Sequence, residues 1–456
     1  MKHKLYCIIV VLIMILPFAA MLIRPTTTST EKKELATWPN IIENNKINSN
    51  YMEEAGRYFE DHIAFRQEMV DVNARLKEKI FKTSANEQVI IGKNNWLYFS
   101  ETLNDYMGNE QLSKREMVAV THNLEQLDQY ATIMGSKLII MVVPNKNTIY
   151  PENMPSNYLP GINNNLINLQ TNLEEKKLTY VDLLKGLQKQ EEVLYFSQDT
   201  HWNTRGANKA YSLLAEKIGL QELYDDKTAK PMENHKGDLA EMLYPISARK
   251  EINYEYNLND FVYTNQEEVV DNMSPWIVTS NEKKQDKLLM FRDSFGESLL
   301  PFLANNFKEG YFSRYVPYNM SQILSVKPDY VIIERTERKI AAFATEMPIM
   351  ENLITTNLDS TPCKTNSSIK IEEDGDFVVI QGLIDQKYIH DNTEVFVEIT
   401  NEKGERKTYI PFYTLTKTGD GNGYHMKIYK SNFSKKDKIN VIINNEGTSY
   451  NVKSYN

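Results

Sequence analysis

Three residues of this chain have the types and the spacing of a nucleophilic catalytic site. Ser294 lies in the stretch 291–298 (FRDSFGES), between a short apolar run and an apolar helical pattern. This junction predicts that a strand ends near Arg292 and that a helix begins just after Ser294. Helix N–H groups carry partial positive charge, so they can hold an oxyanion while the serine hydroxyl attacks a carbonyl carbon. The alternative is that Asp293 or Ser294 only caps the helix.

A second stretch, residues 198–203 (QDTHWN), supplies the partners that such a serine needs. Of the 7 histidines, only His201 has an aspartate two positions before it and a tryptophan directly after it. On a turn, Asp199 holds one imidazole nitrogen, and the other nitrogen is free to take the serine proton. The alternative is a loop histidine whose neighbouring aspartate caps a helix that starts near Thr204.

The elements that must position these residues alternate between strand and helix. Strands are predicted at residues 137–143, 179–183, 193–196, 287–292, 309–315 and 329–334, and helices at residues 113–135, 162–176 and 204–219. This alternation favours an α/β fold, a parallel sheet with helices on both faces. Ligands of such sheets bind beyond the carboxyl ends of the strands, where Asp199, His201 and Ser294 are all expected. Residues 220–285 lack clear alternation, and they either cover the site or form a surface excursion without a role.

The ends of the chain differ from this central domain, which we place at residues 85–350. Lys2 and Lys4 precede an apolar run at residues 5–23, which as a helix is about 28 Å long, close to a bilayer core of roughly 30 Å. Residues 1–25 are therefore predicted to be a transmembrane helix with the N-terminus inside, and a cleaved signal peptide is the alternative. Residues 26–84 are predicted to form a tether and a helical lead-in.

Residues 365–456 are predicted to form an all-β sandwich. Short stretches of period-two alternation are separated there by glycine-containing turns. The aromatic positions of these strands belong either to the core or to a carbohydrate-binding platform.

Composition limits the classes of partner and cofactor. The formal net charge is -9, which argues against a nucleic-acid surface and fits a solvated extracellular protein. The chain has only 2 cysteines and no His/Cys cluster, so we expect no structural zinc site, no other metal and no cofactor.

Residues 199–202 (DTHW), followed by residues 292–296 (RDSFG), resemble the DHHW family of cell-surface proteins and the SGNH-like domain of periplasmic alginate O-acetyltransferases. In ordinary SGNH hydrolases the serine block comes first, whereas here it comes last, as in the alginate acetylation group. The DHHW name expects histidine at position 200, and the alginate group also tolerates threonine there. Further matching pieces lie at residues 31–36, 59–66, 92–98, 143–151, 237–239 and 328–338, so the resemblance covers roughly residues 31–345.

The resemblance implies an SGNH-like serine acyltransferase or esterase with a Ser-His-Asp triad. Ser294 is the expected nucleophile, His201 the general base and acid, and Asp199 the group that orients His201. Backbone N–H groups after Ser294 are expected to hold the oxyanion. Further candidates for oxyanion or substrate binding, chosen only by position or motif, are Asn145, Lys146, Asn147, Trp202 and Arg338.

The function implied is the O-acetylation of a cell-surface or secreted polysaccharide through a seryl ester, outside the cell. In such systems a multi-spanning membrane acyltransferase supplies the acetyl group, and a single-pass anchor in the cell membrane keeps the domain beside it. Two alternatives stay open. Attack by water instead of a sugar hydroxyl gives a carbohydrate acetylesterase, and loss of the chemistry leaves a noncatalytic surface protein that binds glycans or assists assembly.

Overall fold

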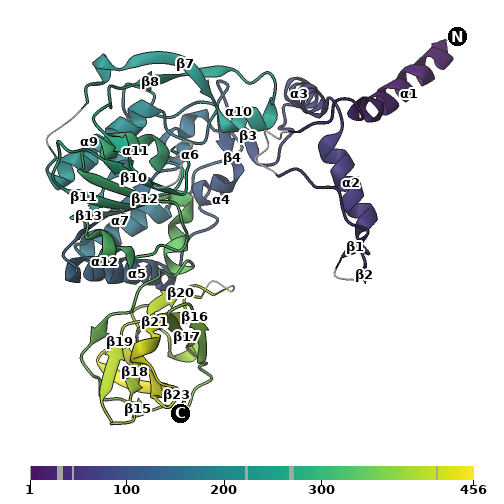
Figure 1. Ribbon diagram of the computed structural model, residues 1–456. Helices are drawn as coiled ribbons and strands as arrows, with labels where there is room; N and C mark the ends of the chain where they lie inside the picture. The colour runs from purple at the N-terminus through teal and green to yellow at the C-terminus, as the bar shows by residue number, and fades with distance from the viewer. Residues whose placement is uncertain are drawn as a thin grey trace.

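A mixed seven-stranded sheet lies at the centre of the chain, with helices around it (Figure 1). The computed structural model describes residues 2–27, 34–43, 46–220, 224–265, 272–416 and 420–455. The strand order of the central sheet is β6-β5-β13-β11-β12-β10-β9. Its strands are β5 (Lys137–Val143), β6 (Tyr180–Val181), β9 (Val262–Tyr263), β10 (Trp276–Ser280), β11 (Lys287–Phe291), β12 (Glu309–Ser313) and β13 (Tyr330–Thr336).

The strands from β6 to β12 in this order are parallel, as predicted, but β10 pairs antiparallel with both of its neighbours, β12 and β9. The prediction of a purely parallel sheet is therefore wrong at one edge. The parallel strands β5, β11 and β13 are buried at nearly every position, whereas β10 alternates between buried and half-buried residues. Antiparallel strands tolerate one solvated face, so β10 suits a place near the edge of the sheet, next to the short edge strand β9. The strand predicted at residues 193–196 is only a single bridge between Tyr195 and Trp202.

The helices of the central domain begin at side-chain caps that the sequence encodes locally. Ser113 and Glu116 form a reciprocal capping box at the start of α5. Asn164 caps α7, and Asn203 caps α9. These helices and their neighbours are α4 (Leu103–Tyr106), α5 (Lys114–Ile133), α6 (Lys146–Ile149), α7 (Asn165–Glu175), α8 (Leu183–Leu187), α9 (Thr204–Ile218), α10 (Asp238–Leu243), α11 (Gly296–Ala304), α12 (Gln322–Val326) and the 3-10 helix η5 (Glu337–Ala344).

Two antiparallel hairpins accompany the central sheet. One hairpin, near the start of the central domain, pairs β3 (Val89–Ile91) with β4 (Leu97–Phe99). The segment that lacked clear alternation contains a second pair, β7 (Lys230–Lys236) and β8 (Lys250–Glu255), with α10 between the two strands.

The C-terminal part of the chain is built from strands, which form a lobe beside α5 (Figure 1). One sheet has the order β14-β19-β18-β22-β23-β15 and the other β16-β17-β21-β20. The strands are β14 (Ile354–Thr355), β15 (Thr361–Pro362), β16 (Lys370–Asp374), β17 (Phe377–Leu383), β18 (Glu394–Thr400), β19 (Arg406–Tyr409), β20 (Phe412–Thr414), β21 (Gly423–Tyr429), β22 (Lys438–Asn445) and β23 (Thr448–Tyr455). Sequence alternation missed β23, because its burial pattern has no clean period of two. The exact domain boundaries stay a prediction.

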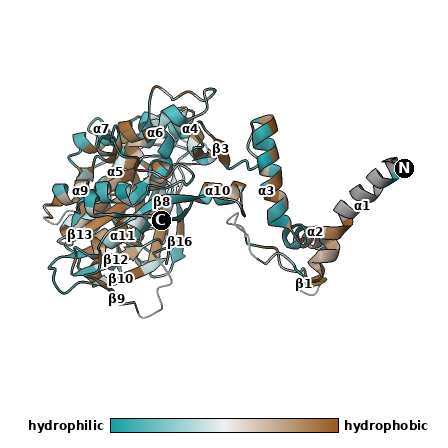
Figure 2. Ribbon diagram, turned by 90° about the horizontal axis from the view of Figure 1, so that it is seen from above, coloured by the Kyte–Doolittle hydropathy of each residue, from teal (hydrophilic) through white to brown (hydrophobic). Residues whose placement is uncertain are grey.

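Of the three N-terminal helices that the structure describes, the first two extend away from the central body (Figure 2), whereas the third contacts it through Asp71 and Arg75, which both bond to Ser247. They are α1 (Lys2–Met21), α2 (Tyr51–His62) and α3 (Arg66–Leu76), followed by the π-helical turn η1 (Lys77–Phe81). Residues 28–33 of the predicted tether lie outside the described residues, as do several side chains of α1. Within the described part of the chain, no helix meets the length and apolarity of a membrane span. The transmembrane anchor thus stays a prediction.

Candidate active site

A continuous hydrogen-bond chain joins Asp199, His201 and Ser294. Nδ1 of His201 lies 2.7 Å from Oδ1 of Asp199, and Nε2 of the same ring lies 2.8 Å from Oγ of Ser294. Asp199 is only 3% exposed, whereas His201 and Ser294 are half-buried. The structure therefore brings together the three residues that the sequence singled out, in the geometry of a nucleophile, its base and the group that orients the base.

The carboxylate of Asp199 accepts four hydrogen bonds. Oδ1 accepts from the backbone N–H and the ring of His201, and Oδ2 accepts from Nε2 of His235 and from the N–H of Asp238, each at 2.7–2.9 Å. Burial raises the pKa of Asp199, but the bonds with His201 and His235 outweigh it and hold that pKa well below its ordinary value. Asp199 is therefore an anion that fixes one tautomer of His201.

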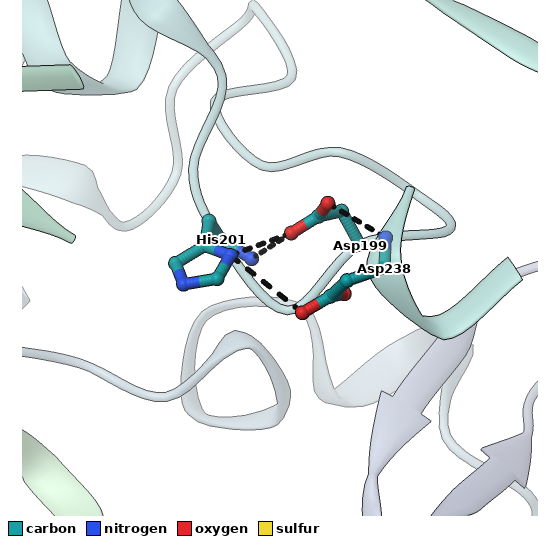
Figure 3. A group of neighbouring side chains, drawn as sticks. All are labelled: Asp199, His201 and Asp238. Carbon is teal, nitrogen blue, oxygen red and sulfur yellow. Dashed lines mark hydrogen bonds and ion pairs between the residues drawn. The ribbon is translucent and has the colours of Figure 1, made fainter. Parts of the chain in front are cut away.

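Asp199, His201 and Asp238 also form a group whose potential metal-ligand atoms all lie within 4.8 Å of one another. Figure 3 shows one ring nitrogen of His201 facing the two carboxylates and the other facing away. Both oxygens of Asp199 already accept two N–H groups each, and Oδ1 of Asp238 accepts the N–H and the hydroxyl of Thr200. The donors occupy the lone pairs that a cation needs, so this arrangement suits an orienting carboxylate better than a metal site.

Long-range contacts hold the loop that carries Asp199. Glu251, on β8, accepts the N–H groups of Ser197 and Gln198, and the ring of His235 stacks on Phe196 with centroids 3.8 Å apart. Both Glu251 and His235 come from residues 220–285, so the reading of that segment as an excursion without a role is wrong. Sequence reasoning missed these residues because nothing local marks a contact between chain segments so far apart.

Lys146 is buried beneath the same loop. Its Nζ donates to the carbonyls of Phe196, Ser197 and Asp199 at 3.2, 3.2 and 2.5 Å. Burial lowers the pKa of Lys146 to about 8, although the charges of Asp199, Glu251 and Asp238 oppose that shift. The contacts make Lys146 a clamp on the loop rather than a group that faces a substrate.

The loop that carries Ser294 is held by two carboxyl groups. Glu334 accepts the N–H of Asp293, and Asp293 accepts the N–H groups of Phe295 and Thr336. A Cβ atom at Gly296 would lie 2.7 Å from Cβ of Arg292 and 3.1 Å from Oε2 of Glu334. Only glycine fits this close approach, which lets α11 begin directly after the serine.

Two backbone N–H groups beside the serine are available to a ligand. The N–H of Phe295 is used by Asp293, but the N–H groups of Ser294 and Gly296 have no acceptor among the residues that the structure describes. The first N–H groups of a helix lack intrahelical partners and attract negative charge. These two donors therefore form a candidate oxyanion site.

The remaining residues predicted from position or motif make contacts within the protein. The side-chain amide of Asn147 donates twice to Thr102, and that of Asn145 donates to Asp105, so both side chains are held within the protein. Trp202 is completely buried and donates to the carbonyl of Phe295, so it supports the nucleophile loop from inside.

Arg338 differs from these residues. Its guanidinium lies over the ring of Phe99, 5.5 Å from the centroid, and it has no hydrogen-bond or ion-pair partner within the described ranges. It follows the carboxyl end of β13, the edge of the sheet where ligands of such folds bind.

The central domain is similar to a known protein family. Residues 89–286 match the family model of the SGNH hydrolase-like domain of the acetyltransferase AlgX. The matched range contains Asp199 and His201 and ends before Ser294. This match confirms the resemblance to alginate O-acetyltransferases that the motifs predicted.

Among curated proteins, the probable alginate O-acetylase AlgJ of Pseudomonas syringae pv. tomato is 26% identical over 220 residues, which cover 46% of this chain and 55% of that protein. AlgJ of Pseudomonas putida is 24% identical over 180 residues, which cover 39% of this chain and 46% of that protein. The chain thus spans about half the length of the curated relatives that it matches.

Solved structures give fainter similarity. A DHHW family protein from Eubacterium siraeum has a TM-score of 0.40 at 17% identity and covers 49% of this chain and 85% of its own. PatB1 of Bacillus cereus has a TM-score of 0.45 at 17% identity, with coverages of 56% and 97%. The O-acetyltransferase domain of Pseudomonas putida AlgJ has a TM-score of 0.39 at 17% identity, with coverages of 56% and 92%.

Proposed function

Because residues 89–286 match the SGNH hydrolase-like domain of AlgX and the curated relatives are probable alginate O-acetylases, we propose that this chain is an O-acetyltransferase of a polysaccharide. The acetyl group passes through an ester on Ser294. The observation that carries this proposal is the chain of contacts from Asp199 through His201 to Oγ of Ser294.

The chemistry takes two symmetrical steps. Nε2 of His201 accepts the proton of Ser294 as Oγ attacks the acetyl carbonyl, and the protonated ring then gives that proton to the departing donor group. In the second step His201 removes a proton from a sugar hydroxyl, whose oxygen attacks the seryl ester. The C–Oγ bond then breaks, and the protonated His201 returns the proton to Oγ of Ser294. Asp199 stays ionised throughout and stabilises the imidazolium that forms in each step.

The oxyanion of both tetrahedral intermediates binds the N–H groups of Ser294 and Gly296. These donors are fixed by the backbone before the reaction starts, so no reorganisation is needed when the negative charge develops. Arg338 is the proposed contact for an anionic or hydroxyl-rich part of the acceptor, since its guanidinium lies over the Phe99 ring but has no hydrogen-bond or ion-pair partner within the described ranges.

The proposal includes the setting of the reaction. The domain lies outside the cell, tethered by an N-terminal membrane anchor, and a multi-spanning membrane acyltransferase supplies the acetyl group. The apolar run at residues 5–23 and the positive charges before it support this arrangement. The C-terminal strands are the proposed carbohydrate-binding domain.

Intact-mass analysis of the full chain in detergent, incubated with an activated acetyl ester, tests the chemistry. We expect one acetyl group on the protein, which moves to acidic polysaccharide oligomers when these are added. Ser294→Ala abolishes the adduct, and Asp199→Asn slows its formation about 10²–10⁴-fold, because the histidine takes the wrong tautomer.

The other outcomes decide between the alternatives. Release of free acetate with every oligomer left unmodified makes the protein an acetylesterase. A folded protein that forms no adduct contradicts the enzyme proposal and leaves a noncatalytic glycan-binding protein.

A further inference from the structure

A pair of carboxyl groups lies beside the loop that carries Ser294. Oε2 of Glu334 accepts the backbone N–H of Asp293 at 2.9 Å. Oδ1 of Asp293 accepts the N–H of Phe295 at 2.8 Å, and Oδ2 accepts the N–H of Thr336 at 2.9 Å. Glu334, on β13, thus binds the backbone of the nucleophile loop, and Asp293, in that loop, binds the backbone at the end of β13. Together the two carboxyl groups join the end of β13 to the nucleophile loop.

The Glu334 side chain is sealed inside the protein. Glu334 is 0% exposed, and its Oε1 atom has no hydrogen-bond partner in the described part of the chain. The start of α11 presses against it, since Oε2 lies within 3.1 Å of the Cβ position of Gly296. Water is therefore excluded from the carboxyl group of Glu334.

No cation within the described ranges forms an ion pair with either carboxyl group. Arg292 is the nearest candidate, but its guanidinium donates to the carbonyls of Asn272 and Ser274. Burial lowers the pKa of Arg292 to about 10. Arg335, on the same strand as Glu334, instead bonds to Tyr318 and Glu346.

The other titratable groups that face the pair are neutral. Burial raises the pKa of Tyr195 and of Tyr318 above the ordinary value, so both phenols keep their protons. For Glu334, burial raises the pKa well above its ordinary range, and the neighbouring charge of Asp293 adds to that shift. A buried carboxylate beside a second, half-buried carboxylate without a counter-ion is costly, and a single proton removes the conflict.

We propose that Glu334 is a positioning residue that stays protonated and shares its proton with Asp293, and that this carboxyl pair holds the nucleophile loop so that Ser294 faces His201. The inference rests on the proposed function of Ser294. When Glu334 loses the proton, the two carboxylates repel each other. The backbone segment from Asp293 to Phe295 shifts, and the serine moves away from Nε2 of His201.

Glu334→Gln and Glu334→Ala separate the proton from the rest of the side chain. Glutamine keeps an acceptor for the N–H of Asp293 and a donor for its carboxylate, but it does not ionise. We expect Glu334→Gln to acetylate Ser294 at nearly the wild-type rate and to lack the loss of rate that the wild type shows at alkaline pH. Glu334→Ala slows acetylation by about 10²-fold at every pH, the order expected when a reacting group is misplaced by about 1 Å.

The reaction is followed as the burst of phenol released from an activated acetyl ester. Glu309→Gln is the matched control, because Glu309 lies on β12, the other neighbour of β11, and pairs with Lys287 at the opposite end of these strands. It keeps the wild-type pH profile. An alkaline loss of rate in Glu334→Gln equal to that of the wild type, or a wild-type rate in Glu334→Ala, would overturn the proposal.

Thermal unfolding without substrate tests the proton independently of catalysis. When folding raises the pKa of a carboxyl group, the folded protein loses stability as the pH rises from the ordinary pKa of that group, 4.5, toward its pKa in the folded state. The melting temperature of the wild type therefore falls more over that pH range than the melting temperature of Glu334→Gln. If the melting temperatures of the two proteins depend equally on pH, Glu334 is not protonated. This outcome contradicts the inference whether or not Ser294 is acetylated. Absence of acetylation together with the expected unfolding difference contradicts only the proposed function.

Discussion

His235 acts on the proposed reaction only through Asp199. Its Nε2 donates to Oδ2 of Asp199 at 2.9 Å, while Nδ1 of His201 takes the other oxygen. One buried carboxylate thus serves two histidines, of which only His201 contacts the serine. A second donor on Asp199 limits the rotation of the carboxylate and so keeps the ring of His201 directed at Ser294.

We therefore expect His235→Ala to lower kcat of acetyl transfer by about 10–10²-fold with KM little changed, because a hydrogen bond to a charged group contributes about 1.5–3 kcal/mol. His235→Gln restores a donor and most of the rate. Steady-state kinetics on both variants measures this effect.

His62→Gln is the matched control. His62 also follows an aspartate, but its Nδ1 lies 2.9 Å from the carbonyl of Tyr58, and its ring stacks on that residue within α2. This variant keeps the wild-type kcat. A wild-type kcat in His235→Ala as well would show that Asp199 is held firmly enough by its other donors.

At the scale of elements, Glu337 joins three segments at the carboxyl edge of the sheet. It follows β13, and its carboxylate accepts the N–H of Asn145, the hydroxyl of Thr148 on α6 and the amide of Asn164, the cap of α7. Burial, and then the neighbouring Asp105, raises the pKa of Glu337 to about 7. The position of α6, which carries the Lys146 clamp, therefore depends on a group that titrates near neutral pH.

A raised pKa in the folded state means that folding binds a proton between the ordinary and the folded value. The wild type should therefore lose stability as pH rises from 4.5 to about 7, and Glu337→Gln should lose less over the same interval. Chemical denaturation at several pH values measures the difference. Glu282→Gln, at an exposed position, is the control and follows the wild type. Parallel curves for Glu337→Gln and the wild type would contradict the titration.

At the scale of the whole molecule, α5 connects the central sheet to the C-terminal strands. Asn123 donates to the carbonyls of Phe343 and Tyr413 and accepts the N–H of Tyr413. His122 bonds to the carbonyl of Pro411, and its ring stacks on Tyr413 with centroids 3.7 Å apart. Buried side chains of both parts belong to one continuous hydrophobic core. We therefore expect one cooperative unfolding transition for both parts.

Burial lowers the pKa of His122 to about 4 from an ordinary value of 6.5. The unfolded chain binds more protons than the folded one between these values, so stability falls as pH is lowered from about 6.5 to about 4. His122→Gln retains a donor for the carbonyl of Pro411 and should lose less melting temperature over this interval. His390→Gln, at an exposed position, should behave as the wild type. Calorimetry across this pH range measures both effects, and equal losses in His122→Gln and the wild type would contradict the role of His122.

The sequence by itself determined what is encoded locally. Asp199 and His201 are two positions apart on one turn, and Ser294 lies where an apolar run meets a helical pattern, so short stretches were enough to select them. The buried strands β5, β11 and β13 were predictable for the same reason, since strands covered on both faces are apolar without interruption. The parallel part of the central sheet and most C-terminal strands follow from such patterns, whereas β9, β10, β14, β15 and β23 were not predicted.

Only the tertiary structure decided what surrounds these residues. His235, Glu251 and Lys146 reach the Asp199 loop from other segments, and Glu334 reaches the serine loop from a neighbouring strand. Such contacts depend on strand order and register, which place residues side by side that no local pattern relates. Burial is likewise a property of the whole fold, so the raised pKa of Glu334 follows from packing. The lowered pKa of Asp199 depends on the distant His235 as well as on its chain neighbour His201.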